Sequence, residues 1–190
     1  MNQATSAEAP AIATLRVGVD DGIDPRTGEP RRPAAVWAAS VLLHAGVGLV
    51  MAGLLQAFWL SIATFEQAAW LNGVVPTEPG ALLRVLMATA LFAIAMLIAV
   101  ASVVAGHYAW HGYGWTPRAG LIAVGVSLMA LMINPLASWG IAPIAAGAGL
   151  LWLPASGVFF ARWHTRRHPV PAPASGGPAD VYYGPLPRYR

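Results

Sequence analysis

The chain has 190 residues, of which 57% are hydrophobic and 10% are charged, and its mean hydropathy is +0.58. This composition is typical of a protein that lies mostly in lipid, and it leaves little room for a second, soluble domain. Cysteine is absent, which excludes disulfides, thiolate metal sites and thiol nucleophiles. All 11 basic residues are arginine, and Ala, Gly and Pro are abundant, as GC-rich genomes tend to encode. We therefore expect a bacterial plasma (inner) membrane.

The first 33 residues predict a disordered cytoplasmic arm. They mix acidic, small and Pro/Gly positions without lasting periodicity, and Pro25, Pro30 and Pro33 stop any helix from propagating through them. The apolar run that follows is far longer than the core of a signal peptide. We therefore expect the arm to be retained.

Four long apolar stretches without a charged residue follow the arm. About 20 apolar residues suffice to span a bilayer as a helix, so the stretches predict an all-α integral membrane four-helix bundle within residues 34–168. The predicted spans are approximately residues 34–60, 85–106, 119–139 and 141–161. Small residues recur along them, most densely around Gly147 and Gly149, and this pattern predicts close helix packing in lipid.

Prolines predict the shape of the last two spans. Asn134-Pro135 and Pro143 bracket the expected turn between them. Pro154 removes a backbone hydrogen bond and is expected to kink the fourth helix. Trp152 would then lie at mid-depth and fill the space that the kink opens.

The positions of arginine predict the orientation. Cytoplasmic loops of membrane proteins carry an excess of basic residues, and ten of the arginines fall on segments that a four-span arrangement places on one side. These are Arg16, Arg26, Arg31 and Arg32 before the first span, Arg118 between the second and third, and Arg162, Arg166, Arg167, Arg188 and Arg190 after the fourth. Only Arg84 departs from the pattern. Both termini are therefore predicted to be cytoplasmic, including a disordered Pro-rich tail at residues 169–190.

Two His-x-x-x-His pairs are the sharpest candidates for chemistry. His107 and His111 end the second predicted span, while His164 and His168 follow the fourth. Residues four apart share a helix face, so each pair can present two imidazoles to one transition-metal ion. No carboxylate is available to orient these rings, and neighbouring arginines repel a cation. The favoured interpretation is that the four histidines are ordinary interfacial residues.

His44 is the ionisable residue predicted to lie deepest in the membrane. It is about 15 Å from the start of the first span at Ala34, whereas His107 lies near a span boundary. Because of this difference in depth, the two histidines are not expected to hold one haem. His44 remains a candidate cofactor ligand, since intramembrane ionisable residues are often functional. Packing against a neighbouring helix is the simpler interpretation.

No catalytic or nucleotide-binding motif is present, and the four spans contain no Asp, Glu, Lys or Arg, which argues against a transporter or pump. We expect a non-catalytic accessory, assembly or scaffold subunit of a larger membrane complex. The alternatives are a small electron-transfer protein that binds haem or a transition metal, and a small-solute carrier or pore. The expected partners are the lipid bilayer, whose anionic headgroups attract Arg162, Arg166 and Arg167, and other membrane subunits. No folded basic domain suggests nucleic-acid binding.

Overall fold

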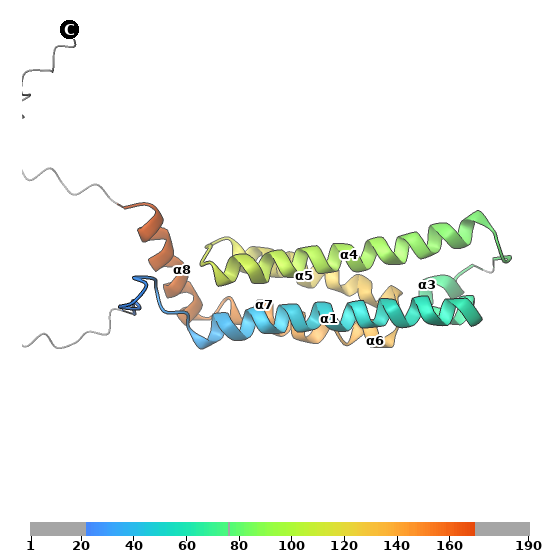
Figure 1. Ribbon diagram of the computed structural model, residues 1–190, viewed down its shortest axis with the longest axis horizontal. Coiled ribbons are helices and arrows are strands. Elements are labelled where there is room, and N and C mark those ends of the chain that lie inside the picture. Colours follow the sequence, from blue (N-terminus) through green and yellow to red (C-terminus); the bar gives the residue numbers. More distant parts are fainter. Residues whose placement is uncertain (1–21, 76, 170–190) are drawn as a thin grey trace, which may run out of the picture. The chain divides into compact units, whose positions relative to one another are not determined.

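The computed structural model describes residues 22–75 and 77–169 (Figure 1). The chain divides into two units between Arg31 and Arg32, and each unit is described by itself. The disorder predicted for the ends of the chain falls largely on residues 1–21 and 170–190, which lie outside the described residues.

The first unit contains a short closed loop at residues 22–31. An isolated antiparallel bridge joins Ile23 to Pro30, and the Arg31 amide donates a hydrogen bond of 2.7 Å to the carbonyl of Gly22. At the tip, the Arg26 amide donates to Oδ1 of Asp24 at 2.9 Å, an arrangement that stabilises tight turns.

The described part of the second unit is built from helices and loops, without a β-strand. Its helices, in chain order, are α1 (Ala34–Ala63), α2 (Phe65–Ala68), α3 (Trp70–Gly73), α4 (Leu82–Trp110), α5 (Thr116–Ser127), the 3-10 helix η1 (Leu128–Met132), α6 (Pro135–Ser138), α7 (Ile141–Leu150) and α8 (Pro154–Arg167). The all-helical prediction is confirmed for these residues.

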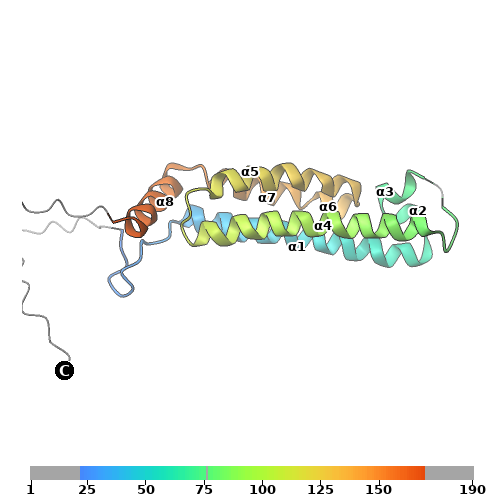
Figure 2. The ribbon, with the colours of Figure 1, turned by 90° about the horizontal axis from the view of Figure 1, so that it is seen from above.

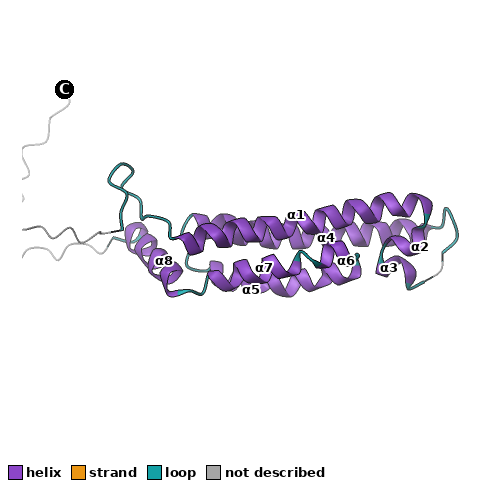
Figure 3. Cartoon of the chain, turned by 90° about the horizontal axis from the view of Figure 1, so that it is seen from below, coloured by secondary structure: helices purple, strands orange, loops and turns teal. Residues whose placement is uncertain are grey.

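Helices α1 and α4 are the two long apolar helices of the described structure. They have 30 and 29 residues, respectively, so each is about 44 Å long and exceeds the roughly 30 Å of a hydrocarbon core. They lie side by side and antiparallel (Figures 1 and 3). Both are long and apolar enough to cross a membrane, as the first two predicted spans required. The structure therefore supports membrane association.

The third predicted span is not one continuous helix. Helix α5 passes into η1, the chain turns at Ile133 and Asn134, and α6 begins at Pro135. Asn134 caps α6, because its Oδ1 accepts a hydrogen bond of 2.9 Å from the Ala137 amide. Proline at the first helical position completes this helix start. The turn was predicted nearer residue 140 and in fact lies at Asn134, inside the predicted span.

The fourth predicted span is also interrupted. Helix α7 ends at Leu150 and α8 begins at Pro154, and the axis bends by 62° between the two. The change of direction predicted at Pro154 is present, as a complete break rather than a kink. With the bent pair counted as one span, the described residues contain three candidate spans, and without it two.

Trp152 occupies the break between α7 and α8, not the middle of a helix. Gly147 on α7 packs against Ala39 near the start of α1, and the two helices are antiparallel. The residues after Gly147 therefore lie level with the first turn of α1. Trp152 is 56% exposed at this end of the bundle, so its predicted place at mid-depth is wrong.

The segments from α5 to α7 form a hairpin that packs on one side of the α1–α4 pair (Figure 2). Small residues allow the close approach: a Cβ added to Gly53 would lie 2.5 Å from the Ala137 nitrogen, and one added to Gly46 would lie 2.8 Å from the Gly140 carbonyl oxygen. Helices α2 and α3 cover the hairpin tip, where the Trp70 amide donates to the Ile133 carbonyl at 3.0 Å. The end of the bundle near this tip is called the tip end below, and the opposite end is called the α8 end.

Candidate functional site

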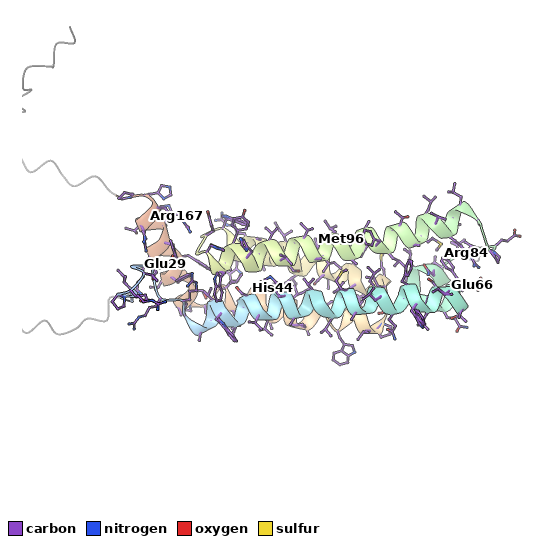
Figure 4. All side chains as sticks on the ribbon, viewed as in Figure 1. Glu29, His44, Glu66, Arg84, Met96 and Arg167 are labelled. Carbon is purple, nitrogen blue, oxygen red and sulfur yellow. The ribbon has the colours of Figure 1, made fainter. Side chains whose placement is uncertain are left out.

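A polar strip crosses the contact between α1 and α4. Ser40 Oγ donates a hydrogen bond of 3.0 Å to the carbonyl of Gly106, which ties the two helices together. One turn further along α1, the His44 ring lies over Gly106, and its Cε1 would be 2.9 Å from a Cβ added there. Figure 4 shows His44 directed from α1 toward α4. One turn before Gly106, Ser102 is fully buried, and its hydroxyl has no hydrogen-bond partner among the described residues.

The hydrogen bond of His44 determines which ring nitrogen is available. Nδ1 lies 2.7 Å from the carbonyl oxygen of Ser40, and because a carbonyl only accepts, Nδ1 must carry the proton. In the neutral ring Nε2 is then left with a lone pair. The side chain is exposed, and no group among residues 22–75 and 77–169 donates a hydrogen bond to Nε2. His44 therefore offers one oriented acceptor on the surface of the bundle.

His44 and His107 lie closer along the bundle than predicted. The His44 ring rests on Gly106, the residue next to His107. Two features reduce the expected difference in depth: helical side chains lean toward the N-terminus of their helix, and α4 continues to Trp110. The difference in depth was the reason for expecting that His44 and His107 do not hold one haem, and this reason is therefore weaker than predicted.

The face of α1 that carries His44 continues into an apolar groove toward the tip end. His44, Gly48, Met51 and Leu55 follow one another at helical spacing on this side. Gly48 faces open space, since a Cβ added there would meet nothing within 4 Å. The groove has a volume of about 530 Å³ and is lined by Met51, Leu54, Leu55, Phe58, Val85, Ala88, Thr89 and Phe92. Its walls come from α1 and α4 alone.

At the α8 end, α8 is docked on the loop that follows α4. Arg167 donates to the carbonyl of Gly112 at 3.2 Å and also to that of His111. Its guanidinium lies 4.0 Å from the centre of the Tyr113 ring and 4.8 Å from that of Trp163, which are cation–π distances. Gly112 has φ of +73°, and the Trp163 ring fills the place of its missing side chain. A residue other than glycine there meets both backbone strain and a clash.

The two histidine pairs lie at this α8 end. The rings of His107 and His111 have centroids 4.4 Å apart, and those of His164 and His168 are stacked at 4.6 Å. In each pair, Nδ1 of the second histidine forms a hydrogen bond with the backbone carbonyl oxygen of the first. The distance is 2.8 Å for His111 and 3.2 Å for His168. In the part of the chain that the structure describes, no three His, Cys, Asp or Glu side chains gather as metal ligands. The four imidazoles are thus not assembled into one site.

Arg84, the exception in the predicted orientation, lies at the tip end. It donates to Oγ1 of Thr77 at 2.9 Å and to the Thr77 carbonyl at 2.7 Å, and it stacks on Phe65 at 4.6 Å. Figure 4 places it at the same end as Glu66 and opposite Arg167. Its charge is used in local contacts that order the loop before α4.

Sequence reasoning identified His44 but missed the residues that define its surroundings. Ser40 lay unremarked in the first apolar run and Gly106 ended the second predicted span as one of its small packing residues, but the contact between them requires the antiparallel register of α1 and α4. Gly112 carried a visible signal, since it stands in the run His-Gly-Tyr-Gly directly after a predicted helix. The α1–α4 groove had no signal in the sequence.

No protein-family model matches this chain, and no curated protein or solved structure was found to match it.

Proposed function

We propose that this protein is a non-catalytic accessory, assembly or scaffold subunit of a larger membrane complex. The observation that carries the proposal is the exposed, oriented acceptor of His44 on a membrane-type helix. Lipid tails supply no hydrogen-bond donor, and a polar group left unpaired in an apolar medium costs about 1–3 kcal/mol. A donor from another protein removes this cost.

The surroundings of His44 suit one occupant, a transmembrane helix of a partner subunit. Gly48, one turn from His44, leaves space for another backbone to approach closely, as small residues do in membrane interfaces. The apolar groove beyond it can receive side chains of the same helix. The partner helix should carry a hydroxyl, amide or indole donor level with His44.

The charge distribution agrees with a role without chemistry of its own. Helix α1 contains no Asp, Glu, Lys or Arg, and in α4 the only such residue is Arg84 near its start. Proton pumps and secondary transporters place ionisable groups along their path at membrane depth. Apart from Arg84, helices α1 and α4 have no Asp, Glu, Lys or Arg that could form such a path with His44.

We infer a multi-pass arrangement with four crossings. The hairpin arms Thr116–Met132 and Pro135–Leu150 are each about 25 Å long, slightly shorter than a hydrocarbon core. The hairpin tip packs on Gly53, which is about 29 Å along α1 from Ala34. The hairpin therefore reaches across one core thickness. The arginine distribution then favours an orientation in which the α8 end and both termini lie on the cytoplasmic side. The abundance of Ala, Gly, Pro and Arg favours a bacterial inner membrane.

The test is crosslinking in native membranes, with two matched positions. Gly48 and Gly125 both face open space, but Gly125 lies on α5, away from His44. A photoreactive benzoylphenylalanine at position 48 should crosslink to a distinct membrane protein, identified by mass spectrometry, while the same residue at 125 should not. His44→Leu should abolish the crosslink, and His44→Gln, which keeps an acceptor, should retain it. Crosslinks to lipid only, or only to a second copy of the chain, would contradict the proposal.

An electron-transfer role is the second candidate, and His44 also provides the observation that favours it. Histidines that bind metals or haem usually donate one ring N–H to a carbonyl and keep the other nitrogen free, as His44 does. A haem shared with a partner would give the purified complex a Soret absorption band that His44→Leu removes. A colourless native complex that still contains the partner would leave only the accessory role.

A further inference from the structure

Asn72 is a buried amide at the tip end of the bundle, and only one half of it is used in the fold. It lies in α3 and is 1% exposed. Its Nδ2 donates a hydrogen bond of 3.1 Å to the carbonyl of Phe65, and because a carbonyl only accepts, this bond fixes the orientation of the amide. No group among residues 22–75 and 77–169 donates to Oδ1. A buried acceptor without a donor is costly, so this oxygen favours a bound donor.

A small cavity lies beside Asn72. Its volume is about 20 Å³, which is enough for one group of the size of a water molecule or a hydroxyl. Two polar side chains line it, those of Asn72 and Ser61, and Ser61 Oγ already donates to the Phe58 carbonyl at 2.7 Å. The other lining residues are Leu54, Ala57, Phe58, Phe65, Ala88 and Leu91. The cavity therefore suits one small donor group.

The cavity adjoins the α1–α4 groove, since the two share the lining residues Leu54, Phe58 and Ala88. The groove has a volume of about 530 Å³, within the range of about 300–1,000 Å³ that is usual for small-molecule sites. Among the described residues, no charged side chain lines the groove or the cavity. A ligand that fits both is uncharged and mostly apolar, and it ends in one small hydrogen-bond donor.

The position of the cavity along the bundle matches that of a lipid headgroup. The four-crossing arrangement, on which this step rests, places one boundary of the hydrocarbon core near Gly53. The cavity residues on α1 fall within residues 54–61, about 2 to 12 Å beyond that boundary. Met51, which lines the groove, lies on the core side of Gly53. A lipid with its polar end in the cavity would thus direct an acyl chain along the groove toward the centre of the membrane.

We propose that the α1–α4 groove binds a diacylglycerol, whose free hydroxyl donates a hydrogen bond to Asn72 Oδ1. Phosphate and sugar headgroups are larger than the cavity, whereas a hydroxyl fits it. Among membrane glycerolipids, diacylglycerol has the headgroup that consists of a single uncharged hydroxyl. One acyl chain lies in the groove. The site is separate from the contact at His44, although the lipid chain and side chains of a partner helix compete for the groove.

The test compares two ligands on the isolated full-length protein in mild detergent by native mass spectrometry. The first, 1,2-dioleoylglycerol, carries the hydroxyl, and its 3-O-methyl ether has the same chains but no donor. At equal mole fraction in the micelles, the alcohol should bind about tenfold more tightly than the ether. Asn72→Leu should bind the alcohol as weakly as the ether. Thr89→Val and Ser61→Ala, which remove the hydroxyl groups that line the groove and the cavity, should keep the preference.

A second pair of variants tests the location of the site without changing Asn72. Ala88 lines both the groove and the cavity, so Ala88→Phe should weaken the binding of both ligands. Ala93 is exposed on the same helix and lines neither, so Ala93→Phe should bind both ligands like the parent.

Equal binding of the alcohol and the ether by the parent would overturn the proposal and leave water as the donor to Asn72. A preference that folded Asn72→Leu retains, or that Thr89→Val loses, would also overturn it. If Asn72→Leu unfolds, Ala88→Phe decides, because unchanged binding of the alcohol would place the site elsewhere. All of these measurements use the isolated protein, so they can fail while the crosslink from position 48 to a partner subunit succeeds, and the reverse.

Discussion

Replacing Gly53 by alanine should destabilise the protein, although alanine is the better helix former. In a helix interior alanine is favoured over glycine by about 1 kcal/mol, so helix propensity alone predicts a gain. At Gly53, however, the new Cβ would lie 2.5 Å from the Ala137 nitrogen and 2.7 Å from its Cα. These are backbone atoms, so no side-chain rotation relieves the clash. The same movement would strain the hydrogen bond of 2.8 Å from Asn134 Nδ2 to the Gly53 carbonyl.

Gly48→Ala is the matched control for Gly53→Ala. Both glycines lie in α1, but a Cβ at position 48 meets nothing within 4 Å. Both variants gain the same propensity term, so the difference between them isolates the packing. Overpacking a close contact costs about 1–3 kcal/mol, and Gly53→Ala should be less stable than Gly48→Ala by that amount.

The measurement is unfolding of the isolated, purified protein in mixed micelles by increasing SDS, followed by circular dichroism and tryptophan fluorescence. We expect Gly48→Ala to shift the midpoint upward and Gly53→Ala to shift it downward. If both variants move upward by similar amounts, the hairpin tip does not pack on α1 at Gly53. The inference of a hairpin that crosses one core thickness would then lose its support.

Two further predictions concern the hairpin and the orientation. Gly147→Leu should lower the free energy of unfolding by about 1–3 kcal/mol, and with it the SDS midpoint, because a Cβ there is already 2.9 Å from the Ala39 carbonyl oxygen. Position 149 faces open space, so Gly149→Leu should stay within about 0.5 kcal/mol of the parent, and equal effects of the two changes would contradict the packing. Green fluorescent protein fused to either terminus should fluoresce and alkaline phosphatase should stay inactive, and an active phosphatase at Arg190 would mean an odd number of crossings.

The two long helices were predictable because each is a local property of the chain. Residues 34–60 and 85–106 lack charge, and an uninterrupted apolar run in lipid satisfies its backbone polar groups only as a helix. The observed helices α1 and α4 include both ranges and extend beyond them. At its start α4 extends past the predicted span because a charge-free run had to begin after Arg84, whereas the Arg84 guanidinium is hydrogen-bonded to Thr77 and the helix includes it.

The boundaries of the last two predicted spans were wrong because hydropathy does not record where an apolar chain turns. The run of residues 119–139 contains Asn134-Pro135, and these two residues provide a cap and a first helical position. Leu153-Pro154 likewise starts a new helix inside residues 141–161. As helix-start signals, Asn134-Pro135 and Leu153-Pro154 indicate the two breaks. Hydropathy averaged over each apolar run does not show them.

The sequence by itself determined that the chain forms apolar helices, that it lacks thiol chemistry, and that its arginines gather on alternate segments. Tertiary structure decided which glycines are close-packed: Gly53 and Gly147 touch other helices, while Gly48 and Gly149 are open. It also decided that the His44 ring rests on Gly106 and that its Nδ1 donates to the Ser40 carbonyl. The physical reason is that these distances depend on the register between helices. Register results from contacts among segments far apart in the sequence, which no local pattern of residue types records.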